Sequence, residues 1–125
     1  MSIQRIIEGD TLILRNDAEG EILRLRETMA DRSATVESAG RFTGEIVNDV
    51  QDELVAMALA SDKLVLDMKA VDYISSAMLK CLLELQHLID SRQGELILTG
   101  LSEQIYEAFE EEGLEDLFII TERII

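Results

Sequence analysis

The chain has 125 residues, 47% of them hydrophobic, and a formal net charge of −15 at pH 7. This length and this hydrophobic content predict a single globular domain over residues 1–125, with enough apolar side chains for one core. The acidic excess argues against nucleic acid and anionic membrane surfaces as partners, since both are bound by clustered Lys and Arg.

The first predicted elements are strands. Residues 11–15 form a short apolar strand, and turn-forming residues 16–20 lead into a second strand over residues 21–26. Together they predict an antiparallel hairpin. A helix over residues 22–30 is an alternative, because this segment is rich in good helix formers. Residues 34–39 predict a further strand.

Helices and strands alternate in the middle of the chain. An apolar stripe at helical spacing follows Thr43, which suits a helix start, and extends to about residue 59. Residues 64–68 form an apolar run that indicates a buried strand. Helical spacing resumes after Ser75, whose hydroxyl can cap the new helix by accepting a hydrogen bond from an amide of its first turn. Ser76 then begins this helix, near the positive end of its dipole.

The last third repeats this alternation. The helix stops around residues 90–94, with Gly94 just beyond its end, and residues 95–99 predict a strand. Ser102 is the predicted N-cap of a third helix, and this helix ends at three glutamates, residues 110–112. Because these acids oppose the helix dipole, we expect them to serve solubility or to contact a partner. A short strand over residues 117–120 closes the chain.

Alternating strands and helices over residues 34–120 predict right-handed crossovers and parallel pairing. The expected fold class is therefore α/β, with a mixed, largely parallel sheet, helices packed on it and an N-terminal antiparallel hairpin.

Signatures of catalysis and of metal binding are sparse. A hydrolase triad of Ser76, His87 and Asp67 fails, because the histidine lies about 16 Å from the serine by helical rise. Asp67 and Asp72 could form a carboxylate pair or bind Mg²⁺, but ordinary loop hydrogen bonding is the simpler interpretation. One histidine and one cysteine, Cys81, give no zinc ligand set. We expect no enzyme activity, no metal and no cofactor.

Cellular location follows from two further features. No apolar run approaches the length of a membrane span, and the first residues lack the apolar centre of a secretory signal. Cys81 lies among leucines, which predicts a buried thiol. We expect a cytoplasmic protein.

The segment over residues 66–79 resembles the signature of the STAS domains, the family that includes bacterial anti-sigma factor antagonists. Residues 66–68 (Leu-Asp-Met) and 73–74 (Tyr-Ile) stand where that family has Leu-Asp-Leu and then an aromatic and an aliphatic residue. Residues 75–79 (Ser-Ser-Ala-Met-Leu) stand where it has Asp-Ser-Ser-Gly-Leu. Ser75 thus replaces an acid of the family, and Met78 replaces its glycine.

This resemblance implies a regulatory protein-interaction module that acts as an anti-sigma factor antagonist in transcription regulation. The residue phosphorylated in the family corresponds to Ser76, with Ser75 as the second choice. The implied partner is an anti-sigma factor with serine-kinase activity. The residues expected to bind it are Thr43, Asp67, Asp72, Ser75, Ser76 and Met78.

Three alternatives remain open at this point. The departures at Ser75 and Met78 motivate a non-switching scaffold subunit that assembles into a homo-oligomer. Capping alone explains a serine pair before a helix. A small-ligand-binding domain would instead predict a ligand that raises thermal stability. The acidic charge serves solubility in each case, or attracts a basic protein partner.

Overall fold

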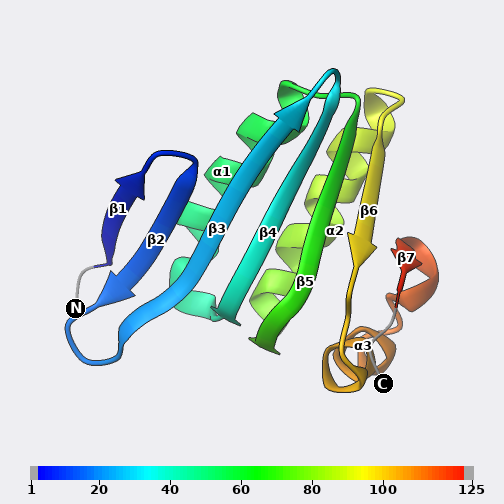
Figure 1. Ribbon diagram of the computed structural model, residues 1–125. Coiled ribbons are helices and arrows are strands. Elements are labelled where there is room, and N and C mark those ends of the chain that lie inside the picture. The colour runs from blue at the N-terminus through cyan, green and yellow to red at the C-terminus, as the bar shows by residue number, and fades with distance from the viewer. Residues whose placement is uncertain (1–2, 123–125) are drawn as a thin grey trace.

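Seven strands form one mixed sheet in the computed structural model, which describes residues 3–122, and they follow one another in chain order (Figure 1). The strands are β1 (Gln4–Glu8), β2 (Thr11–Asn16), β3 (Gly20–Ala30), β4 (Ser33–Phe42), β5 (Lys63–Ile74), β6 (Glu95–Thr99) and β7 (Ile119–Thr121). Neighbours from β1 to β4 are antiparallel, and neighbours from β4 to β7 are parallel. The predicted α/β class, with its mixed sheet and N-terminal antiparallel pairing, is confirmed.

Helices connect the parallel strands. They are α1 (Val47–Leu59), α2 (Ser76–Ser91) and α3 (Glu103–Glu111), with the short 3-10 helices η1 (Gly44–Ile46) and η2 (Glu115–Leu117). Figure 1 shows α1 and α2 side by side behind the sheet, whereas α3 lies beyond the end of β6 and contacts β5. One face of the central strands is therefore covered by two helices, and both helices run along the strands.

Alternate residues of the central strands point into a core between the sheet and these two helices. In β5, Leu64, Leu66 and Met68 are at most 1% exposed, whereas Val65 and Asp67 lie half-buried on the opposite face. The helices bury apolar side chains at helical spacing: Val50, Leu54, Ala58, Leu79, Leu82, Leu85 and Ile89.

Three strand predictions need correction. The strand β1 was not predicted, because its five residues are mostly exposed and show no apolar alternation. The helix alternative for residues 22–30 is wrong: β3 pairs with β4 as far as Ala30, so sheet pairing overrides local helix propensity. At the other end of the chain, residues 115–117 form η2, and the last strand begins only at Ile119.

The predicted N-caps of α2 and α3 are confirmed. The Ser75 hydroxyl accepts a hydrogen bond from the Met78 amide at 3.1 Å, and the Ser102 hydroxyl accepts one from the Ile105 amide at 3.3 Å. The end of α2 differs in detail, since the left-handed residue there is Gln93 (φ 61°) rather than Gly94. A Cβ atom at Gly94 would lie 2.9 Å from the carbonyl oxygen of Asp62, so this glycine permits a close backbone approach.

Candidate functional site

The start of α2 presents two serines with different surroundings. Ser75 is half-buried and its hydroxyl caps the helix. Ser76, the first helical residue, is exposed, and its hydroxyl donates a hydrogen bond to Glu112 Oε1 at 3.1 Å. The exposed hydroxyl at the positive end of α2 therefore belongs to Ser76, whereas the hydroxyl of Ser75 already bonds a backbone amide.

The end of β4 and the start of η1 lie against this helix start. The Ser75 amide donates to the Phe42 carbonyl at 2.8 Å, and a Cβ atom at Gly44 would lie 4.0 Å from the Ala77 Cβ. Thr43, between them, is the N-cap residue of η1, but its hydroxyl makes no capping bond and is buried without a partner. The structure thus brings the backbone at Thr43 next to the serine pair.

The last residues of β5 add charge to the same end of the sheet. Asp72 is exposed, and its neighbour Tyr73 pairs with Arg41 of β4. A hydrogen bond and ion pair with Glu19 at 2.8 Å raise the pKa of Arg41, and the charge of Asp72 adds to that rise. The carboxylates of Glu19 and Asp72 therefore both favour the charged form of this arginine.

A groove of about 220 Å³ lies between the end of β5 and α3. It begins two residues before Ser75, and Tyr73 in its wall is 46% exposed. The lining combines apolar and acidic side chains with one amide: Tyr73, Ile74, Gln104, Ile105, Glu107, Ala108 and Glu111. Such a groove fits an apolar side chain of a partner that also carries positive charge.

Asp67 does not reach this site. We expected it to flank the strand end near Ser76, but β5 continues to Ile74, so eight extended residues put roughly 25 Å between Asp67 and Ser75. Its carboxylate accepts a hydrogen bond from the Lys69 amide at 3.0 Å and lies 3.6 Å from the Lys69 ammonium. Asp67 instead lines a hollow of about 380 Å³ on the open face of the sheet.

This hollow contains three basic side chains, each of which already contacts a carboxylate. Arg24 pairs with Glu21 at 2.8 Å, and Arg26 pairs with Asp10 at 3.3 Å. Lys69 is paired with Asp67 as described above. The positive charges in the hollow are therefore neutralised by neighbouring carboxylates, and the hollow is not a preformed binding site for an anion.

Met78 is also placed differently from our expectation. The side chain is 0% exposed and belongs to the core, so it presents no surface to a partner. The methionine occupies space inside the helix–sheet interface, where the family signature has a glycine.

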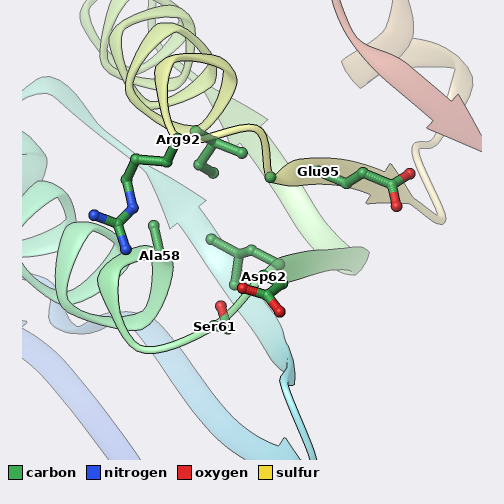
Figure 2. Close-up of a pocket in the computed structure, with 8 residues that line it drawn as sticks. Ala58, Ser61, Asp62, Arg92 and Glu95 are labelled. Atoms are coloured by element: carbon green, nitrogen blue, oxygen red, sulfur yellow. The ribbon is translucent and has the colours of Figure 1, made fainter.

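A small pocket lies at the opposite end of the sheet (Figure 2). Ala58, Ser61 and Asp62 line it from the α1–β5 connection, and Arg92 and Glu95 line it from the α2–β6 connection. Its volume of about 20 Å³ leaves room for no more than a single water molecule. We therefore place the candidate site at the start of α2.

Two further residues from the sequence analysis lie on α2. Cys81 is 4% exposed, as predicted, and burial, with a smaller contribution from Glu84, raises the pKa of its thiol to about 11. His87 is exposed on the outer side of the helix. Within residues 3–122, the structure contains no helix long and apolar enough to span a membrane.

Glu112 and the residues of α3 that line the groove were not identified from the sequence as part of the site. The signal was present in the sequence, because three glutamates at a helix C-terminus oppose the dipole and favour a positive neighbour. That α3 returns to the start of α2 could not be predicted from local pattern, since Ser76 and Glu112 are 36 residues apart.

A family model described as "Mlab, STAS domain" matches residues 25–121. No curated protein matches the chain. The match begins within β3, so β1, β2 and the start of β3 precede the matched residues.

Solved structures with the same fold include three antagonist proteins. An anti-sigma factor antagonist from Mycobacterium paratuberculosis is 17% identical, with 78% of this chain and 84% of that chain covered and a TM-score of 0.70. An anti-sigma-factor antagonist (STAS) domain protein from Planctomyces limnophilus is 15% identical, with coverage of 79% and 89% and a TM-score of 0.66. The Bacillus cell fate determinant SpoIIAA in its phosphorylated form is 14% identical, with coverage of 78% and 90% and a TM-score of 0.62. At these identities the likeness shows a common fold.

Proposed function

Because the chain belongs to the STAS domain family, matched over residues 25–121, we propose that it is an anti-sigma factor antagonist switched by phosphorylation of Ser76. The single observation that carries this proposal is the exposed Ser76 hydroxyl at the first position of α2, beside a Ser75 hydroxyl occupied by capping. Only one of the two serines can be modified without loss of a helix cap.

The partner surface in this proposal surrounds Ser76. It comprises the η1 start at Thr43, the exposed end of β5 at Asp72 and Tyr73, and the groove beside α3. The partner is an anti-sigma factor with serine-kinase activity, met in the cytoplasm. Its contact surface carries basic and apolar side chains, which complement the groove.

Phosphorylation would act through charge. A phosphate adds about −1.5 to −2 charges at pH 7, and the N-terminus of α2 favours an anion at this position. The same positive helix end suits an acidic group of the partner opposite Ser76, and the phosphate would repel that group, so the affinity would fall. Binding of the antagonist to the anti-sigma factor releases a sigma factor, and phosphorylation ends that release.

The test compares three proteins for binding to the anti-sigma factor that co-purifies with the wild type from its native cells. Ser76→Asp should weaken the affinity, measured by calorimetry, at least tenfold, which corresponds to about 1.4 kcal/mol. Ser75→Asp is the matched control, because aspartate keeps the N-cap and adds the same charge one residue away. Wild-type affinity of Ser76→Asp would contradict the switch.

A second candidate is a non-switching scaffold subunit that self-associates. β1 is an edge strand of the sheet, and its Ile7 is 69% exposed, which favours pairing with another copy. Analytical ultracentrifugation separates the two candidates. Concentration-dependent assembly that Ser76→Asp leaves unchanged, and that Ile7→Lys abolishes, would favour the scaffold.

A further inference from the structure

The hydrogen bond from Ser76 to Glu112 joins the start of α2 to the end of α3. Glu112 is the C-cap residue of α3, and the backbone on both sides of it is fixed. The Gly113 amide donates to the Glu110 carbonyl at 3.0 Å, and the Leu114 amide donates to the Phe109 carbonyl at 2.9 Å. These two bonds form a Schellman motif, with Gly113 in the left-handed conformation (φ 69°). The backbone that carries the Glu112 carboxylate is thus firmly placed.

The electrostatics of this junction depend on the state of Ser76. The last turn of α3 contains glutamates and no basic residue, so its side chains add to the negative end of the helix dipole. The start of α2 supplies the opposite partial charge and the donor hydroxyl of Ser76. In the unmodified protein, this side-chain hydrogen bond therefore links two helix ends of opposite sign.

We propose that Glu112 senses the modification of Ser76 and transmits it to α3 and the groove that α3 walls. This inference rests on the proposed function, because it takes Ser76 as the modified residue. Transfer of the γ-phosphoryl group from a nucleoside triphosphate forms the Oγ–phosphorus bond and breaks the bond to the nucleoside diphosphate. The hydroxyl proton passes to solvent. The donor that held Glu112 is lost, and an anion replaces it.

Rotation of the Glu112 side chain alone does not relieve this repulsion. The backbone at Glu112 is fixed, so its rotated carboxylate stays within a Debye length of the phosphate, and the phosphate also neutralises the positive end of α2. The last turn of α3 therefore loosens, together with the Schellman bonds at Gly113 and Leu114. Ala108 and Glu111 belong to this part of α3 and line the groove, so phosphorylation reshapes the groove as well as charging its border.

The test needs only the isolated protein. Phosphoserine is placed at position 76 during synthesis, and backbone amide exchange is compared with that of the unmodified protein. We expect exchange at Gly113 and Leu114 to rise on the order of tenfold in the modified protein. Glu112→Gln should reduce this rise to less than about threefold, whereas Glu111→Gln, with the same change of charge one residue away, should retain it.

Charge reversal gives the sharpest outcome. In Glu112→Lys, the phosphate meets a cation, so modification should slow the exchange at Gly113 and Leu114 instead of speeding it. The inference would be overturned if phosphorylation changed the exchange rates at Gly113 and Leu114 by less than twofold. It would also be overturned if Glu111→Gln and Glu112→Gln reduced the rise in exchange equally. Because no partner is present, failure here is distinct from failure of the proposed function, which is judged by affinity for the anti-sigma factor.

Discussion

Ser75 and Ser76 are adjacent in the sequence but have different roles in the structure. The Ser75 hydroxyl satisfies a backbone amide of α2, whereas the Ser76 hydroxyl bonds an exposed side chain. Ser75→Ala should lower the free energy of unfolding by about 1 kcal/mol, because the cap is lost. Ser76→Ala should change it by less than about 0.5 kcal/mol. Urea denaturation of the two variants measures this difference, and an equal loss in both would contradict the assignment of the cap.

A carboxyl pair gives the fold a pH dependence of its own. Glu27 of β3 points to the helix side of the sheet, and one of its oxygens is buried without a partner. Burial raises the pKa of Glu27 to about 7, and a hydrogen bond and charge repulsion from Glu53, with a smaller effect of Asp10, add to this rise. Glu53 is in turn held by an ion pair with Arg5 at 2.7 Å.

The direction of this pH effect follows from the raised pKa. The folded state favours the protonated Glu27, so its contribution to stability is complete below the usual pKa of 4.5 and is lost as pH rises to about 7. Glu27→Gln should therefore be more stable than the wild type at pH 8, by on the order of 1 kcal/mol after solvent screening, and equal to it at pH 4.5. Urea midpoints at both pH values test this, with Glu37→Gln, an exposed carboxyl of β4, as the control. An unchanged difference between the two pH values would refute it.

At the scale of elements, the N-terminal strands differ in what they contribute. Leu14 of β2 is 0% exposed within the core, whereas Ile7 of the neighbouring β1 is 69% exposed. Leu14→Ala should cost about 3 kcal/mol of unfolding free energy, because it leaves a cavity in the core. Ile7→Ala should cost less than about 0.5 kcal/mol. Thermal or urea unfolding distinguishes them, and a small loss for Leu14→Ala would mean that β2 lies outside the core.

The sequence predicted those elements whose signals are local. The helix caps at Ser75 and Ser102 depend on one hydroxyl and one nearby amide, and both were found. The length of β5 was underestimated, because two register shifts against β4 break the alternation of buried and exposed residues beyond Asp67. That error moved Asp67 into the predicted site. The contact of Ser76 with Glu112 depends on the packing of α3, which no local pattern encodes.

At the scale of the whole molecule, the net charge of −15 opposes the folded state through self-repulsion. Salt shortens the screening length from about 10 Å at 0.1 M to about 3 Å at 1 M. The melting temperature should therefore rise by several degrees between these NaCl concentrations, as measured by calorimetry. Replacing Glu110 and Glu111 by glutamine should make the rise smaller, since both side chains are exposed. A melting temperature that falls with salt would contradict this.

The same charge distribution indicates which surface charge the partner in the proposed function should have. The groove beside α3 and the exposed Asp72 make the surface around Ser76 acidic, so this surface suits a partner with basic side chains. A phosphate on Ser76 would add negative charge at the one position of this surface where the N-terminus of α2 supplies positive potential. The proposed switch therefore depends on a single site in an otherwise acidic region.

The most direct test of the central claim is phosphopeptide analysis of the protein isolated from its native cells in growing, stationary and stressed cultures. Trypsin should release residues 70–80 as one peptide that carries both serines, and fragmentation separates the two positions. We predict phosphate on Ser76 in at least one of these states. Phosphate confined to Ser75, or an unmodified peptide in all three cultures, would contradict the switch at Ser76.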